Sequence, residues 1–236
     1  MRYRKSVIVL GTLLLSTLLV FWQSALAGPP QKPGNPGLPG CLAEVADLNK
    51  RLDQLQSQAL VSQTGQLDSY YPGDDGDHQA GVPWPTPRFT DQGDWTIKDN
   101  LTGLIWMKDA NCDGTKAWTE AVDFCSNLAD SMCGLNDGSV AGDWRLPNAH
   151  ELASLIHWGF WNPALPNTAG TGQWSHGDPF VNVQSAGSPF YYTSTTYLFQ
   201  NTPDTGEAWT VPMSSGGIVD MQKSSRYFVW CVRDAQ

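Results

Sequence analysis

Five cysteines that follow an amino-terminal export signal constrain the fold of this 236-residue chain more than any other feature. Residues 1–27 combine an early basic cluster, an apolar run from Val7 to Trp22 and the small-residue triplet Ala25-Leu26-Ala27, which is the pattern of a cleavable secretory signal. We expect cleavage before Gly28, with an uncleaved amino-terminal anchor as the alternative. An exported chain enters an oxidising compartment, so an even subset of the cysteines is expected in disulfides, with one left over. The sequence therefore predicts a protein of the periplasm, the cell surface or the medium.

The segment 28–40, GPPQKPGNPGLPG, has the spacing of a short collagen-like sequence. Glycine recurs every third residue from Gly34 to Gly40, and the period is broken at Gln31. Only glycine fits at the axis of a collagen triple helix, but so few triplets are not stable alone. A polyproline-type linker is the alternative for this segment.

Residues 41–63 are predicted to form a helical coiled-coil stalk. Apolar positions alternate at spacings of four and three, as in the seam of a coiled coil, at Cys41, Val45, Leu48, Leu52, Leu55 and Ala59. A single helix would bury only this narrow stripe, so we expect a homotrimer, in which Cys41 would form an interchain disulfide. The alternative is a helix packed against its own head.

The charge of the chain excludes some partners. The 23 acidic residues outnumber the 14 basic ones, giving a formal net charge of −9. Nucleic acids and anionic membrane surfaces attract basic proteins, so we expect neither as a partner. After the signal, no segment is apolar enough to span a membrane.

Residues 70–236 are expected to form a single globular head of the α+β class. Short strand-like segments are separated by glycine, proline and aspartate. The first pair reads as a hairpin about the turn Asp99-Asn100, with one buried face formed by Trp95, Ile97, Leu104 and Trp106. Helical spacing predicts helices over 118–128 and 149–158.

The head resembles the C-terminal domain family of the collagen-like adhesin of Legionella. The segments that carry the resemblance run through the head in order: RFTDQGDWTIKDNLTGLIWMKDANC, WTEAVDFCSNL, DWRLPNAHELASLI, YYTSTTY, AWTV and YFVWCVRD. The collagen-like and coiled-coil stalk resembles the same adhesin in miniature. The resemblance implies a C-type-lectin-like fold with two disulfides, Cys125 to Cys231 and Cys112 to Cys133. A cysteine-rich zinc site is the alternative, although paired C-x-x-C spacing is missing.

Residues 109–120 fit the calcium-loop spacing D-x-N-x-D-G-x5-E. The candidate ligands are the side chains of Asp109, Asn111, Asp113 and Glu120 and the carbonyl of Thr115. Two features weigh against calcium: Lys116 stands where an apolar residue is usual, and a strand enters the loop where a helix is usual. The alternative is a plain turn stabilised by local backbone bonds. Calcium is the only cofactor that the sequence suggests.

Candidate ligand contacts lie in the second half of the head. Trp158, Trp161 and Trp174 occur in a loop rich in glycine and proline, and indole faces stack well on sugar rings. Lys223 and Arg226 are the candidates for a local contact with an anionic group. The tryptophans of the family-like segments are expected in the core: Trp106, Trp118, Trp144 and Trp230.

Motifs of catalysis are missing from the sequence. It contains no G-x-S-x-G elbow, no H-E-x-x-H pair and no phosphate loop, so we expect no enzyme activity. The resemblance implies an exported, adhesin-like module whose head recognises a glycan or another extracellular partner. The family adhesin is associated with sulfated glycosaminoglycans, which this acidic head does not suit, so a neutral glycan or a protein receptor is expected. The alternative function is a structural scaffold without a small ligand.

Overall fold

A computed structural model describes the head of the protein and two residues of the preceding segment. The described residues are 45, 47, 61–187, 189–200, 202 and 204–235. The predicted signal, the collagen-like segment and Cys41 lie outside them. So does most of the predicted coiled coil, of which Val45 and Asp47 have helical backbone. Among the described residues, no helix is long and apolar enough to cross a membrane.

The last residues of the predicted coiled coil are not helical. Ser62 forms a parallel β-bridge with Val82, and the N–H of Gln63 donates to the carbonyl of Val82 at 3.0 Å. These backbone bonds replace helical ones and join residues 61–63 to the compact unit Ala59–Gln236. The head therefore includes residues 61–63, which the sequence places in the stalk.

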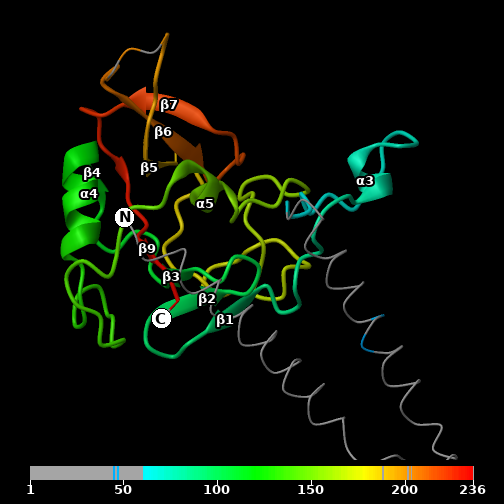
Figure 1. The fold of residues 1–236 in the computed structure, drawn as a ribbon, viewed down its shortest axis with the longest axis horizontal. Coiled ribbons are helices and arrows are strands. Elements are labelled where there is room, and N and C mark those ends of the chain that lie inside the picture. The colour runs from blue at the N-terminus through cyan, green and yellow to red at the C-terminus, as the bar shows by residue number, and fades with distance from the viewer. Residues whose placement is uncertain are drawn as a thin grey trace, which may run out of the picture. The chain divides into compact units, whose positions relative to one another are not determined.

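The first sheet contains the predicted hairpin. Its strands are antiparallel and lie in the order β1 (Phe89–Asp91), β2 (Thr96–Asp99), β3 (Ile105–Met107) and β9 (Val232–Arg233) (Figure 1). Ile97 pairs with Trp106 across the hairpin. The prediction of one buried face is wrong for β3, because all three of its consecutive residues are buried and join the core, so both faces of this strand are covered. Trp95 is also not inward: it precedes β2 with a φ of 67° and is exposed.

The second sheet carries the longest strands. Its order is β4 (Thr115–Lys116), β8 (Tyr227–Phe228), β5 (Phe190–Thr196), β6 (Glu207–Pro212) and β7 (Val219–Gln222). The β5–β8 pair is parallel and the other pairs are antiparallel. The carboxyl-terminal part of the chain thus contributes to both sheets.

Three helices are described: α3 (Asp75–His78), α4 (Trp118–Asn127) and α5 (Ala149–Ala153). The position of α4 agrees with the helix predicted over 118–128, and Ala121 and Cys125 form its buried face. By contrast, the helix predicted over 149–158 is too long, because α5 ends at Ala153, five residues before Trp158. After Ala153 the chain continues in turns, which still bury Leu155 and Ile156. The head is a mixed α+β structure, as the sequence predicts.

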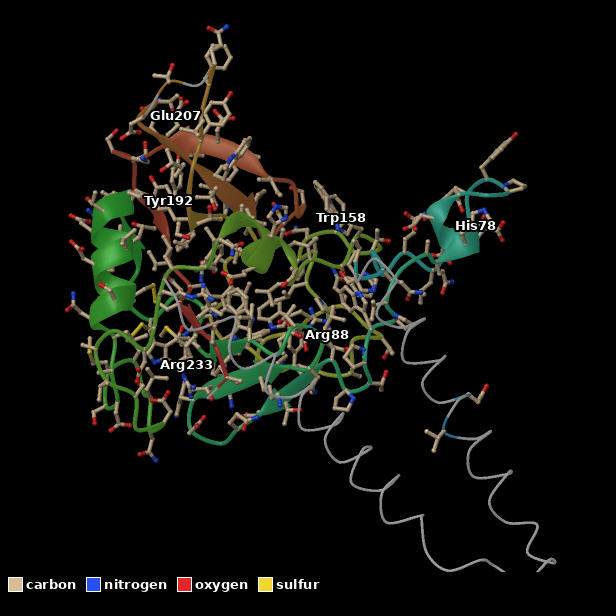
Figure 2. The ribbon with its side chains drawn as sticks, viewed as in Figure 1. His78, Arg88, Trp158, Tyr192, Glu207 and Arg233 are labelled. Carbon is tan, nitrogen blue, oxygen red and sulfur yellow. A yellow bond between two sulfur atoms is a disulfide. The ribbon has the colours of Figure 1, made fainter. Side chains whose placement is uncertain are left out.

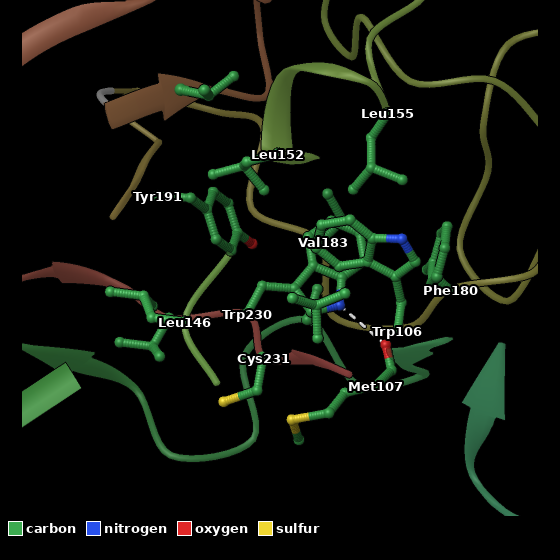
Figure 3. Close-up of a cluster of buried hydrophobic side chains, with 14 of the residues drawn as sticks. Trp106, Met107, Leu146, Leu152, Leu155, Phe180, Val183, Tyr191, Trp230 and Cys231 are labelled. Atoms are coloured by element: carbon green, nitrogen blue, oxygen red, sulfur yellow. Dashed lines mark hydrogen bonds between the residues drawn. The ribbon is translucent and has the colours of Figure 1, made fainter. Parts of the chain in front are cut away.

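The core is centred on the indole of Trp230 (Figure 3). Its ring meets Trp106 and Phe180 edge-on, at centroid distances of 5.6 and 4.7 Å. Its Nε1 donates to the carbonyl of Met107 at 2.8 Å, which satisfies the one polar atom of the buried ring. Trp106, Trp144 and Trp230 are buried, as expected, whereas Trp118 is only half-buried.

A fully buried ion pair of Arg88 and Asp99 lies beside this core. The Arg88 guanidinium also donates to the carbonyl of Ser154 at 2.9 Å, so it ties the entry of β1 to the residues after α5. Figure 2 shows Arg88 inside the head and His78 at its surface. A buried charge of this kind needs its partner, since an unpaired one would be costly.

Two disulfides hold distant parts of the head together. Cys125 on α4 is bonded to Cys231, which directly precedes β9. Cys112, after β3, is bonded to Cys133, after α4. These are the two bridges that the family resemblance implies.

Candidate functional site

A groove of about 570 Å³ opens at the beginning of α5. This size falls within the range of roughly 300–1,000 Å³ that is common for ligand sites. Helix α5 lies against β5 and β6 (Figure 1), so segments distant in sequence meet here. The described lining residues are Asn148, Ala149, His150, Thr195, Trp209 and Ile218. We take this groove as the candidate functional site.

The first turn of α5 is fixed by a capping box. The Asn148 Oδ1 accepts the N–H of Glu151 at 2.9 Å, and the Glu151 carboxylate accepts the N–H of Asn148 at 2.8 Å. Glu151 is held in turn by the two terminal guanidinium nitrogens of Arg145, at 2.6 and 2.8 Å. The hydrogen bonds from Arg145 to Glu151, and then to Asp234, raise the pKa of Arg145. Asn148 and His150 therefore stand on a helix start with a defined position.

Thr195 connects this helix start to the sheet. Its Oγ1 accepts the N–H of Ala149 at 3.1 Å, and so provides a partner for one of the helix N–H groups that have none inside the helix. Two residues earlier in β5, the hydroxyl of Thr193 donates to the carbonyl of Trp209 on β6 at 2.7 Å. The polar and aromatic sides of the groove are thus joined by hydrogen bonds.

Trp209 supplies the aromatic surface of the groove. Its ring is half-buried and meets Tyr197 edge-on, with the centroids 4.9 Å apart. Among the hydrogen bonds between described residues, none uses the Trp209 Nε1. The indole can therefore offer a ring face and one N–H donor to a ligand.

The rest of the lining combines apolar and neutral polar groups. Ala149 and Ile218 are apolar, while Asn148 and His150 are exposed and polar. The described lining residues include no carboxylate and no lysine or arginine. This combination can stack on one face of a ligand and form hydrogen bonds at its edges.

The carboxylates among the predicted calcium ligands are bonded to other groups of the protein. One oxygen of Asp109 accepts the N–H of Asn111 and the other accepts the side-chain amide of Asn182, both at 2.9 Å. The carboxylate of Asp113 pairs with Lys116. The carboxylates of Asp109 and Asp113 are therefore already bonded within the protein, whereas the buried Oδ1 of Asn111 has no hydrogen-bond partner among the described residues.

An arginine stands between the other two predicted ligands. Arg226 donates to the Glu120 carboxylate at 2.8 Å and to the Thr115 carbonyl at 2.7 Å. The N–H of Ala117, together with Arg226, lowers the pKa of Glu120. In the described part of the chain, no three His, Cys, Asp or Glu side chains gather in a way that could hold a metal. With Lys116 and Arg226 among them, the residues of this loop do not fit a calcium ion.

The two candidate cationic contacts are paired within the head. Lys223 bonds to the Asp204 carboxylate at 3.0 Å, and its ammonium lies 4.3 Å from the centroid of the Trp118 ring. Arg226 is bound to Glu120 and Thr115, as described above. The structure does not bring either cation into the groove, and both are already neutralised.

The three candidate tryptophans have different environments. Trp158 is 54% exposed and Trp161 is 72% exposed, as the sequence predicts for surface residues. Trp174 is half-buried against the core, and its Nε1 donates to the carbonyl of Phe180 at 3.2 Å. None of the three lines the groove, although Trp158 lines a smaller cleft.

Sequence reasoning missed the groove residues as a set. The available signal for these residues was the family resemblance, because the segments that carry it contain Asn148, His150, Thr195 and Trp209. The segments DWRLPNAHELASLI, YYTSTTY and AWTV each suggested a structural element. Only the fold shows that they border one groove.

Comparison with known proteins identifies a family for most of the head. The family model described as the Lcl C-terminal domain matches residues 95–233. No curated protein matches the chain. All the described residues that line the groove fall within the matched range, whereas residues 61–94 precede it.

Proposed function

The chain belongs to the Lcl C-terminal domain family, and we propose that it is an exported, adhesin-like binding module rather than an enzyme. In this proposal the groove at the start of α5 holds the ligand. One observation carries the proposal: three segments of the family resemblance meet at the groove. DWRLPNAHELASLI contributes Asn148, Ala149 and His150, YYTSTTY contributes Thr195, and AWTV contributes Trp209.

The proposed ligand is a neutral glycan, with a segment of an extracellular protein as the other possibility. The ring of Trp209 suits stacking against the apolar face of a sugar, and Asn148, His150 and Thr195 can bond its hydroxyl groups. A sulfated polyanion suits the head poorly, because the chain has a net charge of −9 and Lys223 and Arg226 are paired. Since Lys116 and Arg226 bond to predicted calcium ligands, we propose that the head binds its ligand without calcium.

The same proposal includes the location and assembly of the protein. Two disulfides suit an oxidising compartment, in line with the export signal in the sequence. The bond from α4 to the carboxyl-terminal residues supports a C-type-lectin-like head. The heptad pattern of residues 41–63 supports a homotrimer with Cys41 bridged between chains.

A glycan array tests the binding function. The chain from Gly28 onward is applied with calcium and, separately, with a chelator. Selective binding to neutral glycans that persists in the chelator is the expected result. Binding to sulfated glycans alone would contradict the proposed ligand class, and binding to no glycan or extracellular protein would favour a structural scaffold.

Light scattering tests the assembly independently of the ligand. The same chain is measured with and without reductant. A trimer under both conditions is expected. A monomer would exclude the trimeric stalk and leave the groove to be judged by binding alone.

A further inference from the structure

A second cleft, of about 240 Å³, lies between two parts of the head. One wall is the turn after α5, which includes Trp158 and Phe160. The opposite wall is the segment that includes Asp68 and Tyr70, which precedes the family-matched range. The cleft therefore depends on residues that the family match does not include.

The two walls are held together by defined contacts. The N–H of Trp158 donates to the carbonyl of Thr64 at 2.9 Å. The ring of Trp84 is edge-on to His157 at 5.0 Å, and its Nε1 donates to the carbonyl of Gln63 at 2.7 Å. The ring of His157 stacks on Phe160, with centroids 3.9 Å apart. These contacts join residues 63 and 64 to the turn after α5.

Aromatic surface in this cleft faces solvent. Trp158 is 54% exposed and Tyr70 is 83% exposed, and Figure 2 shows Trp158 at the surface of the head. The electron-rich face of an indole or phenol ring attracts a cation that approaches within about 6 Å. The cleft thus presents surfaces of the kind that bind positively charged groups.

The carboxylate of Asp68 adds a negative charge at the cleft. Among the described residues it has no hydrogen-bond or ion-pair partner, and it is exposed. The carboxylates of α3 and its cap are different, because each is engaged: Asp74 by the N–H of Tyr70, Asp75 by the hydroxyl of Thr64 and Asp77 by the N–H of Gly73. The described lining residues include no lysine or arginine that could pair with Asp68.

We propose that this cleft binds an alkylammonium group, either a trimethylammonium head group or the side chain of a lysine. Trp158 and Tyr70 present their ring faces to the cation, and Asp68 compensates its charge. The cleft is smaller than the roughly 300–1,000 Å³ of typical ligand sites, so it suits a single charged group rather than an oligosaccharide. The net charge of −9 favours the approach of a cation. This site is separate from the groove at α5 and does not rest on its function.

Calorimetric titration of the signal-free chain tests the proposal at constant ionic strength. The probes are choline, Nα-acetyl-lysine methylamide, and 3,3-dimethylbutan-1-ol, which has the shape of choline without its charge. Methyl glucoside serves as a neutral sugar. We expect at least one cationic probe to bind and the two neutral probes to bind at least about fivefold more weakly. The stronger of the two cationic probes identifies the source of the ammonium group.

Matched variants locate the binding site. Trp158→Leu and Asp68→Asn should each weaken binding of the cationic probe roughly five- to tenfold. Trp161→Leu, which changes a more exposed indole outside the lining of the cleft, should leave it unchanged. Both cleft residues are exposed, so the variants are expected to fold, and a thermal melt checks this. Equal binding of choline and its neutral analogue, no effect of the two cleft variants, or binding of none of the cations would overturn the proposal.

Discussion

The Oγ1 of Thr195 on β5 accepts the N–H of Ala149, the first residue of α5, at 3.1 Å. This bond joins two family segments at the groove, so it should matter both to stability and to ligand binding. In Thr195→Val the shape is kept but the helix N–H loses its acceptor, and we expect a loss of about 1 kcal/mol in the free energy of unfolding. Thr195→Ser keeps the oxygen and should be close to the wild type. Urea denaturation of the three proteins checks this, and equal stability of the valine and serine variants would show that the bond is unimportant.

The two disulfides should contribute unequally to stability. The Cys125–Cys231 bond closes a sequence separation of 106 residues, against 21 for Cys112–Cys133. In the chain-entropy account, the longer loop adds about 1.4 kcal/mol more to the free energy of unfolding. Cys125 and Cys231 are also fully buried, so replacing them loses packing as well. Urea denaturation of the two double alanine variants should therefore rank Cys125→Ala/Cys231→Ala as the less stable, and the reverse order would contradict the account.

His157 should make the head sensitive to acid. Its side chain is 4% exposed, and burial, assisted by the nearby Arg88 guanidinium, lowers its pKa from 6.5 to about 4. The unfolded chain then binds the proton more readily than the folded one. The contribution of the neutral His157 side chain to the free energy of unfolding is therefore complete above pH 6.5. It is lost as the pH falls toward 4, by up to about 3 kcal/mol.

The comparison of wild type with His157→Gln isolates this contribution from the titration of carboxylates. Urea denaturation is measured at about pH 7 and about pH 4.5. The glutamine variant is less stable than the wild type at neutral pH but should lose less stability on acidification. An equal loss in both proteins would show that His157 does not titrate with a lowered pKa.

Calcium should not stabilise the head. Lys116 pairs with Asp113, and Arg226 bonds to both Glu120 and Thr115, so cations of the protein pair with three of the five predicted ligands. A ligand that binds only the folded state raises the melting temperature. Thermal melts with calcium and with chelator should therefore superimpose. A rise in melting temperature with calcium that the chelator reverses would instead indicate that this loop binds calcium.

Local patterns in the sequence predicted several elements of the head. The alternation around Asp99-Asn100 gave the hairpin of β2 and β3, and helical spacing gave α4. These features depend on neighbours in sequence. The prediction for α5 was too long, because the N–H of His157 bonds to the distant carbonyl of Ala164 and not within the helix. Likewise, the exposure of Trp95 follows from its left-handed backbone, which alternation does not reveal.

The candidate site was less predictable, because it depends on contacts between segments. Trp174 and Trp158 have similar sequence surroundings, yet one packs against the core and the other lies at the surface. The spacing of residues 109–120 gave no indication that Arg226, more than a hundred positions away, would take two of the expected ligands. The sequence predicts Trp209 only as a strand residue, because it does not reveal that β6 lies beside α5.

The most direct test of the proposed function is the affinity of a Trp209→Ala variant for the neutral glycan that binds best on the array. Trp209 faces the groove and Trp161 does not, so Trp161→Ala is the matched control. Loss of a stacking aromatic should weaken binding by about 1 to 2 kcal/mol, which is roughly a five- to thirtyfold rise in Kd. We expect this loss for Trp209→Ala and an unchanged Kd for Trp161→Ala, measured by calorimetry on folded proteins. Undiminished binding by Trp209→Ala would show that the groove at α5 is not the binding site.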